Sequence, residues 1–378
     1  MKTPVNRWPT ARKLLIIRLD ASGDVLMCTP AIKALRNAGF HLSLLTSTSG
    51  AMVGSRLDDV RHVITADVIW MKAAAAGSGA KILDIAAVLR DHNFDGCVIF
   101  HSYSQSPLPA AMLCHLAGIP RQLAYCRENP YYLISDWIRE SEPESLVRHE
   151  VQRQLDLVSE LGGILHDEPK LQLRVSTDDD HAVHAALTQA GIQSGERFLL
   201  LHPGATALSR RYPVSAWIAT CKQLSESLTL PLVLAGSEED RLCLMRLQES
   251  LSGKRVSVIN TLDFGGLAAL IGRATVLIAN NSAPAHLAAA VNTPVVVLYA
   301  STNPQHTPWT KRCHVLSNAV PCAPCYRSTC PQEHHACMTG IAPLQIVEAV
   351  NDLLNETEKI TYPFEKRSLL FSISSRST

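Results

Sequence analysis

The sequence lacks a long apolar run, an excess of charge and a large share of aromatic residues. Its 35 Lys and Arg nearly balance 34 Asp and Glu, so no basic field indicates nucleic acid and no acidic tail indicates disorder. The apolar run after the basic N-terminus is too short for a secretory signal, and no segment is long enough to cross a bilayer. With 47% hydrophobic and 5% aromatic residues, we expect a cytoplasmic α/β protein.

A chain of 378 residues is too long for one compact core, and its pattern repeats strand, turn and helix. Such alternation predicts mostly parallel sheets. We expect an N-terminal Rossmann-like domain over 1–180, a C-terminal one over 181–357 and a tail over 358–378, with a ligand cleft between the two sheets. The expected strands are 14–17, 41–46, 96–100, 122–125, an edge strand at 170–175, and 197–201, 232–234, 256–259, 276–279 and 295–298, with 129–145 irregular.

The segment Leu14–Arg36 opens the first domain with an apolar strand, a small acidic turn and a helical pattern. In parallel sheets, ligands bind at the turn after a strand's carboxyl end. Asp24 lies there, so it is a candidate reactive carboxylate. The alternative is that Asp24 only favours the positive end of the helix.

Two motifs of the second half follow expected strands and favour a phosphate. His202–Pro213 combines small residues, which let the backbone approach a ligand, with Arg210 and Arg211. Arginine suits bidentate phosphate recognition. In the motif Asn280–Leu287 we expect a helix start, with Ser282 as the capping candidate and Pro284 as the first helical residue. The free amides and the histidine at this helix start form a pocket suited to a phosphate or a sugar.

Three further features keep two interpretations each. Glu238 can accept ribose or base hydrogen bonds, or simply favour a helix start. His101 can touch substrate, although a histidine satisfied within its loop is commoner. Asp178, Asp179 and Asp180 can bind a divalent cation, but they follow no buried strand, so a capped helix start is favoured.

The eleven cysteines include a cluster within one short loop, 321–338. Disulfides are unexpected in a reducing compartment, and tetrathiolate spacing selects zinc or iron. We expect a structural metal here; unbound thiols are the alternative, and His334 or His335 can replace one ligand. The expected ligands are Cys322, Cys325, Cys330 and Cys337.

Over most of residues 13–355, the chain resembles glycosyltransferase family 9, typified by lipopolysaccharide heptosyltransferases. The resemblance rests on RLDASGDVLMCTPAIKALR, HPGAT…SRRYP, GGLAALIGRATVLIANNSAPAHLAAA and PVVVLYASTNP, in the family's order. It implies a GT-B fold and an inverting transfer without a catalytic metal. Asp24 takes the position of the general base, and Arg210 that of a basic phosphate contact that is Lys in many relatives. The implied donor-binding residues are Thr206, Arg210, Glu238, Leu262, Asn281, Ser282, Ala283 and His286.

The family's donor motif, Asp-Thr/Ser-Gly-x-x-His-Leu, reads Asn281-Ser282-Ala283-Pro284-Ala285-His286-Leu287 here. Asn281 lacks the carboxylate and Ala283 lacks the freedom of glycine, so the donor sugar or nucleotide can differ.

The resemblance predicts transfer of a sugar, first of all heptose from ADP-heptose, to a glycan such as lipopolysaccharide core. A peripheral contact with the inner membrane and a homo-oligomer are compatible with it. The alternatives are a family member acting on a protein or another glycan with a different donor, or a non-catalytic sugar-nucleotide-binding or assembly protein. A dinucleotide-dependent oxidoreductase is disfavoured, because neither domain's first turn carries G-x-G-x-x-G.

Overall fold

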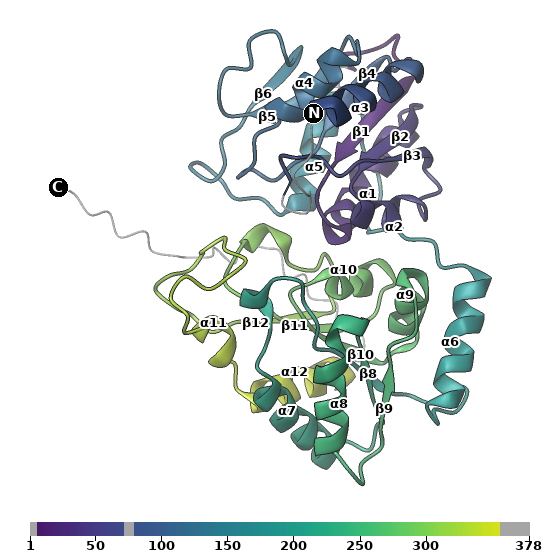
Figure 1. The fold of residues 1–378 in the computed structure, drawn as a ribbon, viewed down its shortest axis with the longest axis vertical. Coiled ribbons are helices and arrows are strands. Elements are labelled where there is room, and N and C mark those ends of the chain that lie inside the picture. Colours follow the sequence, from purple (N-terminus) through teal and green to yellow (C-terminus); the bar gives the residue numbers. More distant parts are fainter. Residues whose placement is uncertain (1–5, 72–78, 356–378) are drawn as a thin grey trace, which may run out of the picture.

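The computed structural model describes residues 6–71 and 79–355, which form two α/β domains (Figure 1). The expected fold class, with two mostly parallel sheets, is confirmed, and the domain bounds stay a prediction. The expected tail, 358–378, lies outside the described residues. Within the described ranges, no helix combines the length and apolar character that crossing a bilayer requires.

The N-terminal sheet has six parallel strands in the order β3-β2-β1-β4-β5-β6. Its central strand is buried from Leu14 onward, which is why it reads as a continuous apolar run. The strands are β1 (Lys13–Arg18), β2 (His41–Thr46), β3 (Val60–Thr65), β4 (Gly96–Ile99), β5 (Gln122–Cys126) and β6 (Asp136–Arg139), and the helices are α1 (Ser22–Asn37), α2 (Thr48–Gly54), α3 (Gly79–Asp91), α4 (Leu108–Leu116) and α5 (Glu150–Ser159).

The C-terminal sheet repeats this topology in the order β12-β11-β10-β7-β8-β9. Helix α6 (Thr177–Gln189) precedes it and packs against α9. Its strands are β7 (Leu199–His202), β8 (Leu232–Ala235), β9 (Val256–Ile259), β10 (Val276–Asn280), β11 (Val295–Leu298) and β12 (Cys313–Leu316), with α7 (Val214–Ser227), α8 (Arg241–Ser250), α9 (Phe264–Arg273), α10 (Ala283–Ala290), α11 (Ala336–Thr339) and α12 (Pro343–Asn355), and the short turns η1 (Leu208–Arg210), η2 (Glu238–Asp240) and η3 (Pro304–His306).

In both sheets the strand order reverses at the first strand, between β1 and β4 and between β7 and β10. The crevice at such a reversal is where open α/β sheets bind ligands, at the carboxyl ends of the strands. The turns after β1, β7 and β10 carry three of the motifs found in the sequence. The topology therefore places these motifs at the two ligand-binding edges.

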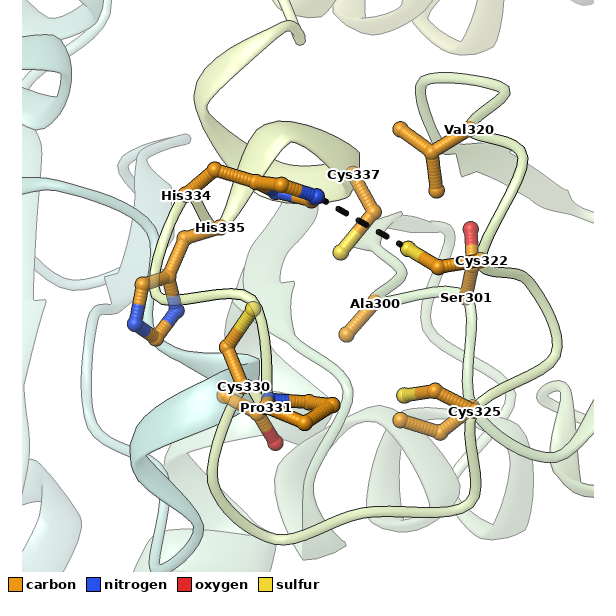
Figure 2. Close-up of a pocket in the computed structure, with 12 residues that line it drawn as sticks. Ala300, Ser301, Val320, Cys322, Cys325, Cys330, Pro331, His334, His335 and Cys337 are labelled. Atoms are coloured by element: carbon orange, nitrogen blue, oxygen red, sulfur yellow. Dashed lines mark hydrogen bonds between the residues drawn. The ribbon is translucent and has the colours of Figure 1, made fainter.

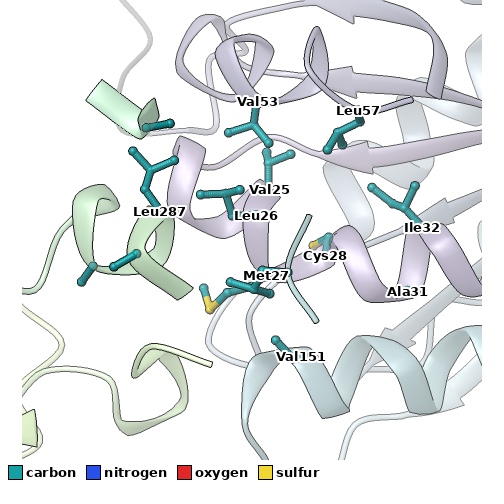
Figure 3. Packing of buried hydrophobic residues seen from close by; sticks show 14 of the residues in the cluster. Val25, Leu26, Met27, Cys28, Ala31, Ile32, Val53, Leu57, Val151 and Leu287 are labelled. Atoms are coloured by element: carbon teal, nitrogen blue, oxygen red, sulfur yellow. The ribbon is translucent and has the colours of Figure 1, made fainter. Parts of the chain in front are cut away.

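Helix α1 lies at the contact between the domains. Leu26 and Met27 share one buried apolar cluster with Leu287 of α10 (Figure 3). Pro30 lies inside α1 and cannot donate to the Leu26 carbonyl, which accepts from the Thr29 hydroxyl at 2.7 Å instead. The burial of this helix fixes the acidic turn of the first motif against the second domain.

Several element predictions were wrong. Residues 170–175 form no strand, since the segment runs as extended chain along α1, with the Gln172 amide donating to Thr29. The region 129–145, expected to be irregular, contains β6, which pairs with β5. Strand β12 and helix α12 were not predicted. Both come after the last clear strand–helix repeat, and their packing onto the C-terminal sheet stabilises them.

Candidate active site between the domains

Asp24 occupies the third position of α1, beside the carboxyl end of β1. Its Oδ2 accepts from the Ala21 amide at 3.1 Å, and its Oδ1 accepts from Arg18 Nη2 at 3.2 Å. The side chain keeps 20% of its surface exposed. Asp24 therefore does favour the helix start, as the simpler interpretation holds, and it also remains accessible and belongs to a charged network.

The buried Arg18 guanidinium holds three carboxylates together. Its Nη1 donates to Glu150 at 2.6 Å, and its Nε forms an ion pair with Asp20 at 2.9 Å, in addition to the bond to Asp24. Burial alone would raise the pKa of Glu150, but attraction to Arg18 and Arg153 lowers it to about 2. Burial also raises the pKa of Asp20 despite the ion pair with Arg18. The sequence signal for this network is Arg18, a charged residue at the end of a buried strand, and we did not predict its role from the sequence.

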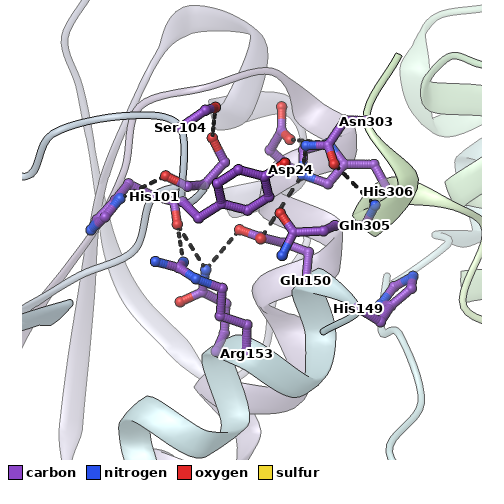
Figure 4. A network of polar contacts seen from close by, with 12 residues as sticks. Asp24, His101, Ser104, His149, Glu150, Arg153, Asn303, Gln305 and His306 are labelled. Atoms are coloured by element: carbon purple, nitrogen blue, oxygen red, sulfur yellow. Dashed lines mark hydrogen bonds and ion pairs between the residues drawn. The ribbon is translucent and has the colours of Figure 1, made fainter. Parts of the chain in front are cut away.

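After β11, residues 303–307 cross to the N-terminal domain and join this network (Figure 4). We call them the crossing segment. Gln305 Nε2 donates to Glu142 and, at 2.8 Å, to the Arg148 carbonyl. His149 Nε2 lies 2.8 Å from the Thr307 carbonyl. These contacts hold the carboxyl edges of the two sheets close to each other.

His306, from the same crossing segment, lies between two carboxylates of the other domain. Its Nδ1 is 3.6 Å from Asp24 Oδ1, and its Nε2 is 3.9 Å from Glu150 Oε2. Burial lowers the pKa of His306 to about 4, so the ring is neutral at pH 7. Nothing in the sequence pattern pointed to His306, because its role depends on the docking of the two domains.

The two phosphate-type motifs of the C-terminal domain meet, as expected from their equivalent positions. Asn280 joins them, since its Nδ2 donates to the Pro203 carbonyl at 2.6 Å and its Oδ1 accepts from the Tyr212 amide at 3.2 Å. Arg210 ends η1, and its Nε is buried with no hydrogen-bond partner among the described residues. A half-buried cation with an unused donor is suited to an anionic ligand.

The Arg210 charge reaches the residues around Asp24. Burial is the largest cause of the shift at three of them: it lowers the pKa of His286 and of His306 and raises the pKa of Tyr299, and the Arg210 charge acts to lower all three. The pKa of His286 is lowered to about 3, which makes this ring neutral. The side chain of Asn281 lies close enough to Tyr299 to act against the rise in its pKa.

Gly23 brings the two halves of the site into contact. A Cβ at Gly23 would lie 2.9 Å from His286 Cδ2, closer than real Cβ atoms come to other side chains. Because Gly23 directly precedes Asp24, only a glycine allows α10 to approach the acidic turn this closely. The sequence-predicted residues Asp24, Arg210, Asn281 and His286 therefore gather around one inter-domain site.

Other predicted donor residues lie in different settings. Ser282 occupies the N-cap position of α10, but its side chain does not cap the helix and its hydroxyl donates to the Gly204 carbonyl at 3.4 Å. Ala283 is the first residue of α10, so Pro284, expected there, is the second. Glu238 is exposed and pairs with Arg241 at 2.7 Å. Thr206 is exposed as well, and Leu262 packs against the core.

His101 and the acidic residues Asp178, Asp179 and Asp180 fit the simpler of their two interpretations, a histidine satisfied within its loop and a capped helix start. Both ring nitrogens of the buried His101 lie 2.8 Å from main-chain carbonyl oxygens. Asp179 accepts from the N-cap Ser176 amide at 2.8 Å and pairs with Arg56, so it caps α6.

The cysteine cluster borders this site. Its four thiols and the rings of His334 and His335 line one small cavity (Figure 2). Cys322 Sγ is 3.9 Å from His334 Nε2. In the described part of the chain, however, no three His, Cys, Asp or Glu side chains converge closely enough to hold a metal ion. The residue types fit a soft metal, but the thiols would have to move inward to bind one.

A sequence model of glycosyltransferase family 9 (heptosyltransferase) matches residues 84–336, well over half of the chain. This chain belongs to glycosyltransferase family 9. Lipooligosaccharide heptosyltransferase 2 of Campylobacter jejuni is 26% identical over 171 residues, 44% of this chain and 54% of that protein. Lipopolysaccharide heptosyltransferase 2 of Escherichia coli is 24% identical over 360 residues, 92% of this chain and 99% of that protein. The match to the Campylobacter relative therefore spans only about half of its length.

A solved family 9 glycosyltransferase from Veillonella parvula has the same fold. Its TM-score is 0.77 at 17% identity, covering 91% of this chain and 97% of that one. The expected GT-B architecture is thereby confirmed. Family 9 membership also gives a context to the inter-domain site, because a glycosyltransferase must hold a donor and an acceptor side by side.

Proposed function

We propose that this chain transfers heptose from ADP-heptose to a hydroxyl of lipopolysaccharide core. Family membership supports a glycosyltransferase, and the names of the relatives support the sugar and the acceptor. The observation that carries the proposal is the inter-domain site, in which an accessible carboxylate on one domain and an arginine with an unused buried donor on the other both lie near His306.

The residues of the site suit an inverting displacement. Asp24 takes the proton from the acceptor hydroxyl as that oxygen bonds to the anomeric carbon, and the bond to the ADP diphosphate breaks. Arg210 and the amides at the start of α10 stabilise the negative charge on the leaving diphosphate. General-base help of this kind contributes about 10²–10⁴-fold.

The experiment supplies ADP-heptose and a heptose-free lipopolysaccharide core and measures ADP release and product mass. Wild-type protein should form product. Asp24→Asn should abolish transfer while its affinity for ADP stays within about twofold, because Arg210 and α10 are untouched. The control is Asp58→Asn, since Asp58 is exposed and, within the described ranges, forms an ion pair with Arg174 alone. Undiminished turnover in Asp24→Asn would rule out the base.

The same assay tests the alternatives. Donor hydrolysis or transfer with another nucleotide sugar would indicate a different donor, for which Asn281 and Ala283 are the first residues to examine. Binding of ADP-heptose without any turnover on glycan or protein acceptors would favour a non-catalytic binding protein. Nothing in the arrangement of the described residues favours that alternative over catalysis.

We also propose a structural zinc or iron ion at the cysteine cluster, with no part in the reaction. Four thiolates would hold it, and His334 can replace one of them. The cysteine loop, 321–338, contacts the phosphate motif His202–Pro213. The Ser209 amide donates to the Ser328 carbonyl at 3.1 Å, and the Ser209 hydroxyl donates to the Arg327 carbonyl at 2.8 Å. Because Ser209 precedes Arg210, a metal that stiffens this loop would also steady Arg210.

Elemental analysis of purified protein tests the metal. We expect about one zinc or iron per chain, and much less in Cys322→Ser. Cys243→Ser is the matched control, because Cys243 lies on α8 outside the cluster. Wild-type protein without bound metal, even after refolding in zinc or iron, would contradict the proposal.

A lipopolysaccharide acceptor implies work at a membrane surface, so we propose a cytoplasmic protein that contacts the inner membrane peripherally. Tyr131 and Tyr132, between β5 and β6, expose 79% and 98% of their surface and are suited to such a contact. Flotation with lipopolysaccharide-containing vesicles tests it, and Tyr132→Ser should weaken binding. The expected homo-oligomer stays a prediction.

A further inference from the structure

The turn η3 carries two hydrogen bonds in series that end on His306, whose ring lies beside Asp24. The backbone amide of Gln305 donates to Asn303 Oδ1 at 3.0 Å, which fixes the orientation of the Asn303 side chain. Asn303 Nδ2 then lies 3.3 Å from His306 Nε2. Figure 4 shows Asn303 and His306 side by side near Asp24.

This order of donors determines the tautomer of His306. An amide nitrogen can only donate, so His306 Nε2 must accept. A neutral imidazole that accepts at one nitrogen carries its proton on the other. The proton therefore sits on Nδ1, which is the nitrogen nearest Asp24 Oδ1, at 3.6 Å. That distance is slightly long for a hydrogen bond, and such contacts tighten when ligands bind.

Asp24 is thus approached by groups of both domains. Arg18 and the Ala21 amide come from its own domain, whereas His306 comes from the domain that carries the phosphate motifs. Arg18 and His306 both lie beside Oδ1 of Asp24, so together they orient the plane of the carboxylate. His306 reaches Asp24 only while the crossing segment is docked through Gln305 and Thr307.

We propose that His306 is a positioning residue for Asp24, donating from Nδ1 in a tautomer set by Asn303 and so coupling the orientation of the carboxylate to the docking of the donor domain. The role as base partner rests on the proposed function, whereas the tautomer does not. The neighbouring Glu150 offers a purely structural role for the ring, because Glu150 Oε2 is buried, has no hydrogen-bond partner among residues 6–71 and 79–355, and lies 3.9 Å from His306 Nε2. The two roles use different ring nitrogens and can be separated.

The first experiment needs no substrate. Protein labelled with ¹⁵N-histidine is studied by imidazole NMR, and the His306 signal is assigned by its loss in His306→Asn. We expect a protonated Nδ1 in the wild type. Asn303→Asp keeps the cap on the Gln305 amide but replaces the donor to Nε2 by an acceptor, so Nε2 should become protonated. A wild-type ring protonated on Nε2 alone would overturn the proposal.

The second experiment is kinetic. His306→Leu and Asn303→Asp should lower kcat about tenfold, a change of about 1.4 kcal/mol in the barrier, with the KM for donor within about twofold. His306→Asn places an amide donor near the Nδ1 position and should recover most of the loss, whereas His306→Gln, which reaches toward Glu150 instead, should not. His181→Leu, on the exposed face of α6, is the control.

The outcomes separate the two proposals. If the wild type transfers no sugar from ADP-heptose, the proposed function fails, and the NMR experiment still decides the tautomer. If the wild type is active and His306→Leu retains full kcat, the positioning role fails while the function stands. Recovery by His306→Gln rather than His306→Asn would assign the ring to Glu150 and also overturn the proposal.

Discussion

Replacing Glu150 by glutamine tests the charged network directly. The substitution keeps the volume of a fully buried side chain and removes one of the three negative charges around Arg18. The pKa of Glu150 falls from 4.5 to about 2 on folding. Each pKa unit corresponds to about 1.4 kcal/mol, so the ionised carboxylate contributes roughly 3 kcal/mol to the free energy of unfolding at pH 7.

The sign follows from the direction of the shift. Because the folded-state pKa is depressed, this stabilisation is complete above the unfolded-state value near 4.5 and is lost as the pH falls toward 2. At pH 3.5 the wild type should have lost about 1.4 kcal/mol of it. The difference between wild type and Glu150→Gln should therefore shrink from roughly 3 kcal/mol at pH 7 to roughly 2 kcal/mol at pH 3.5.

Urea unfolding, followed by tryptophan fluorescence and circular dichroism, measures the free energy of unfolding of wild type and Glu150→Gln at pH 7 and at pH 3.5. Glu144→Gln is the control, because Glu144 is exposed in the same segment; it should change the free energy of unfolding by less than about 0.5 kcal/mol. A loss in Glu150→Gln below about 1 kcal/mol at pH 7, or a loss that does not change with pH, would refute the reasoning.

Two further predictions concern the faces of the site. Arg210→Met should weaken ADP binding about 10–100-fold in calorimetry, which is the loss expected for a charged hydrogen bond. The control is Arg246→Met on the surface of α8, which should leave ADP binding unchanged. If Arg210→Met binds ADP as tightly as the wild type, Arg210 is not part of the phosphate site. Gly23→Ala should cost about 1–3 kcal/mol in the free energy of unfolding and lower kcat, because the new methyl group meets His286. Gly272→Ala, whose Cβ would make only an ordinary van der Waals contact with Val291 at 3.8 Å, is its control, and an unperturbed Gly23→Ala enzyme would contradict the close approach.

The elements that the sequence predicted well are those with a strong local pattern. The strands at 14–17 and 276–279 are apolar throughout, and 41–46 is buried from Leu42 onward, because helices cover both faces of their sheets. Asp24, Arg210 and the Asn280–Leu287 motif were found because ligands of such sheets bind in the turns after the strands. In contrast, 170–175 alternates like an edge strand but has no strand beside it to pair with.

The amino-acid sequence by itself determined the two parallel sheets, the family and the turns that carry the candidate chemistry, because each depends on residues close together in the chain. Only the tertiary structure decided which side chains meet between the domains. Arg18, Glu150 and His306 are separated by more than a hundred residues from one another, and their partnership depends on how β1, α5 and the crossing segment dock. No local pattern encodes that docking, so the network around Asp24 appears only once the chain is folded.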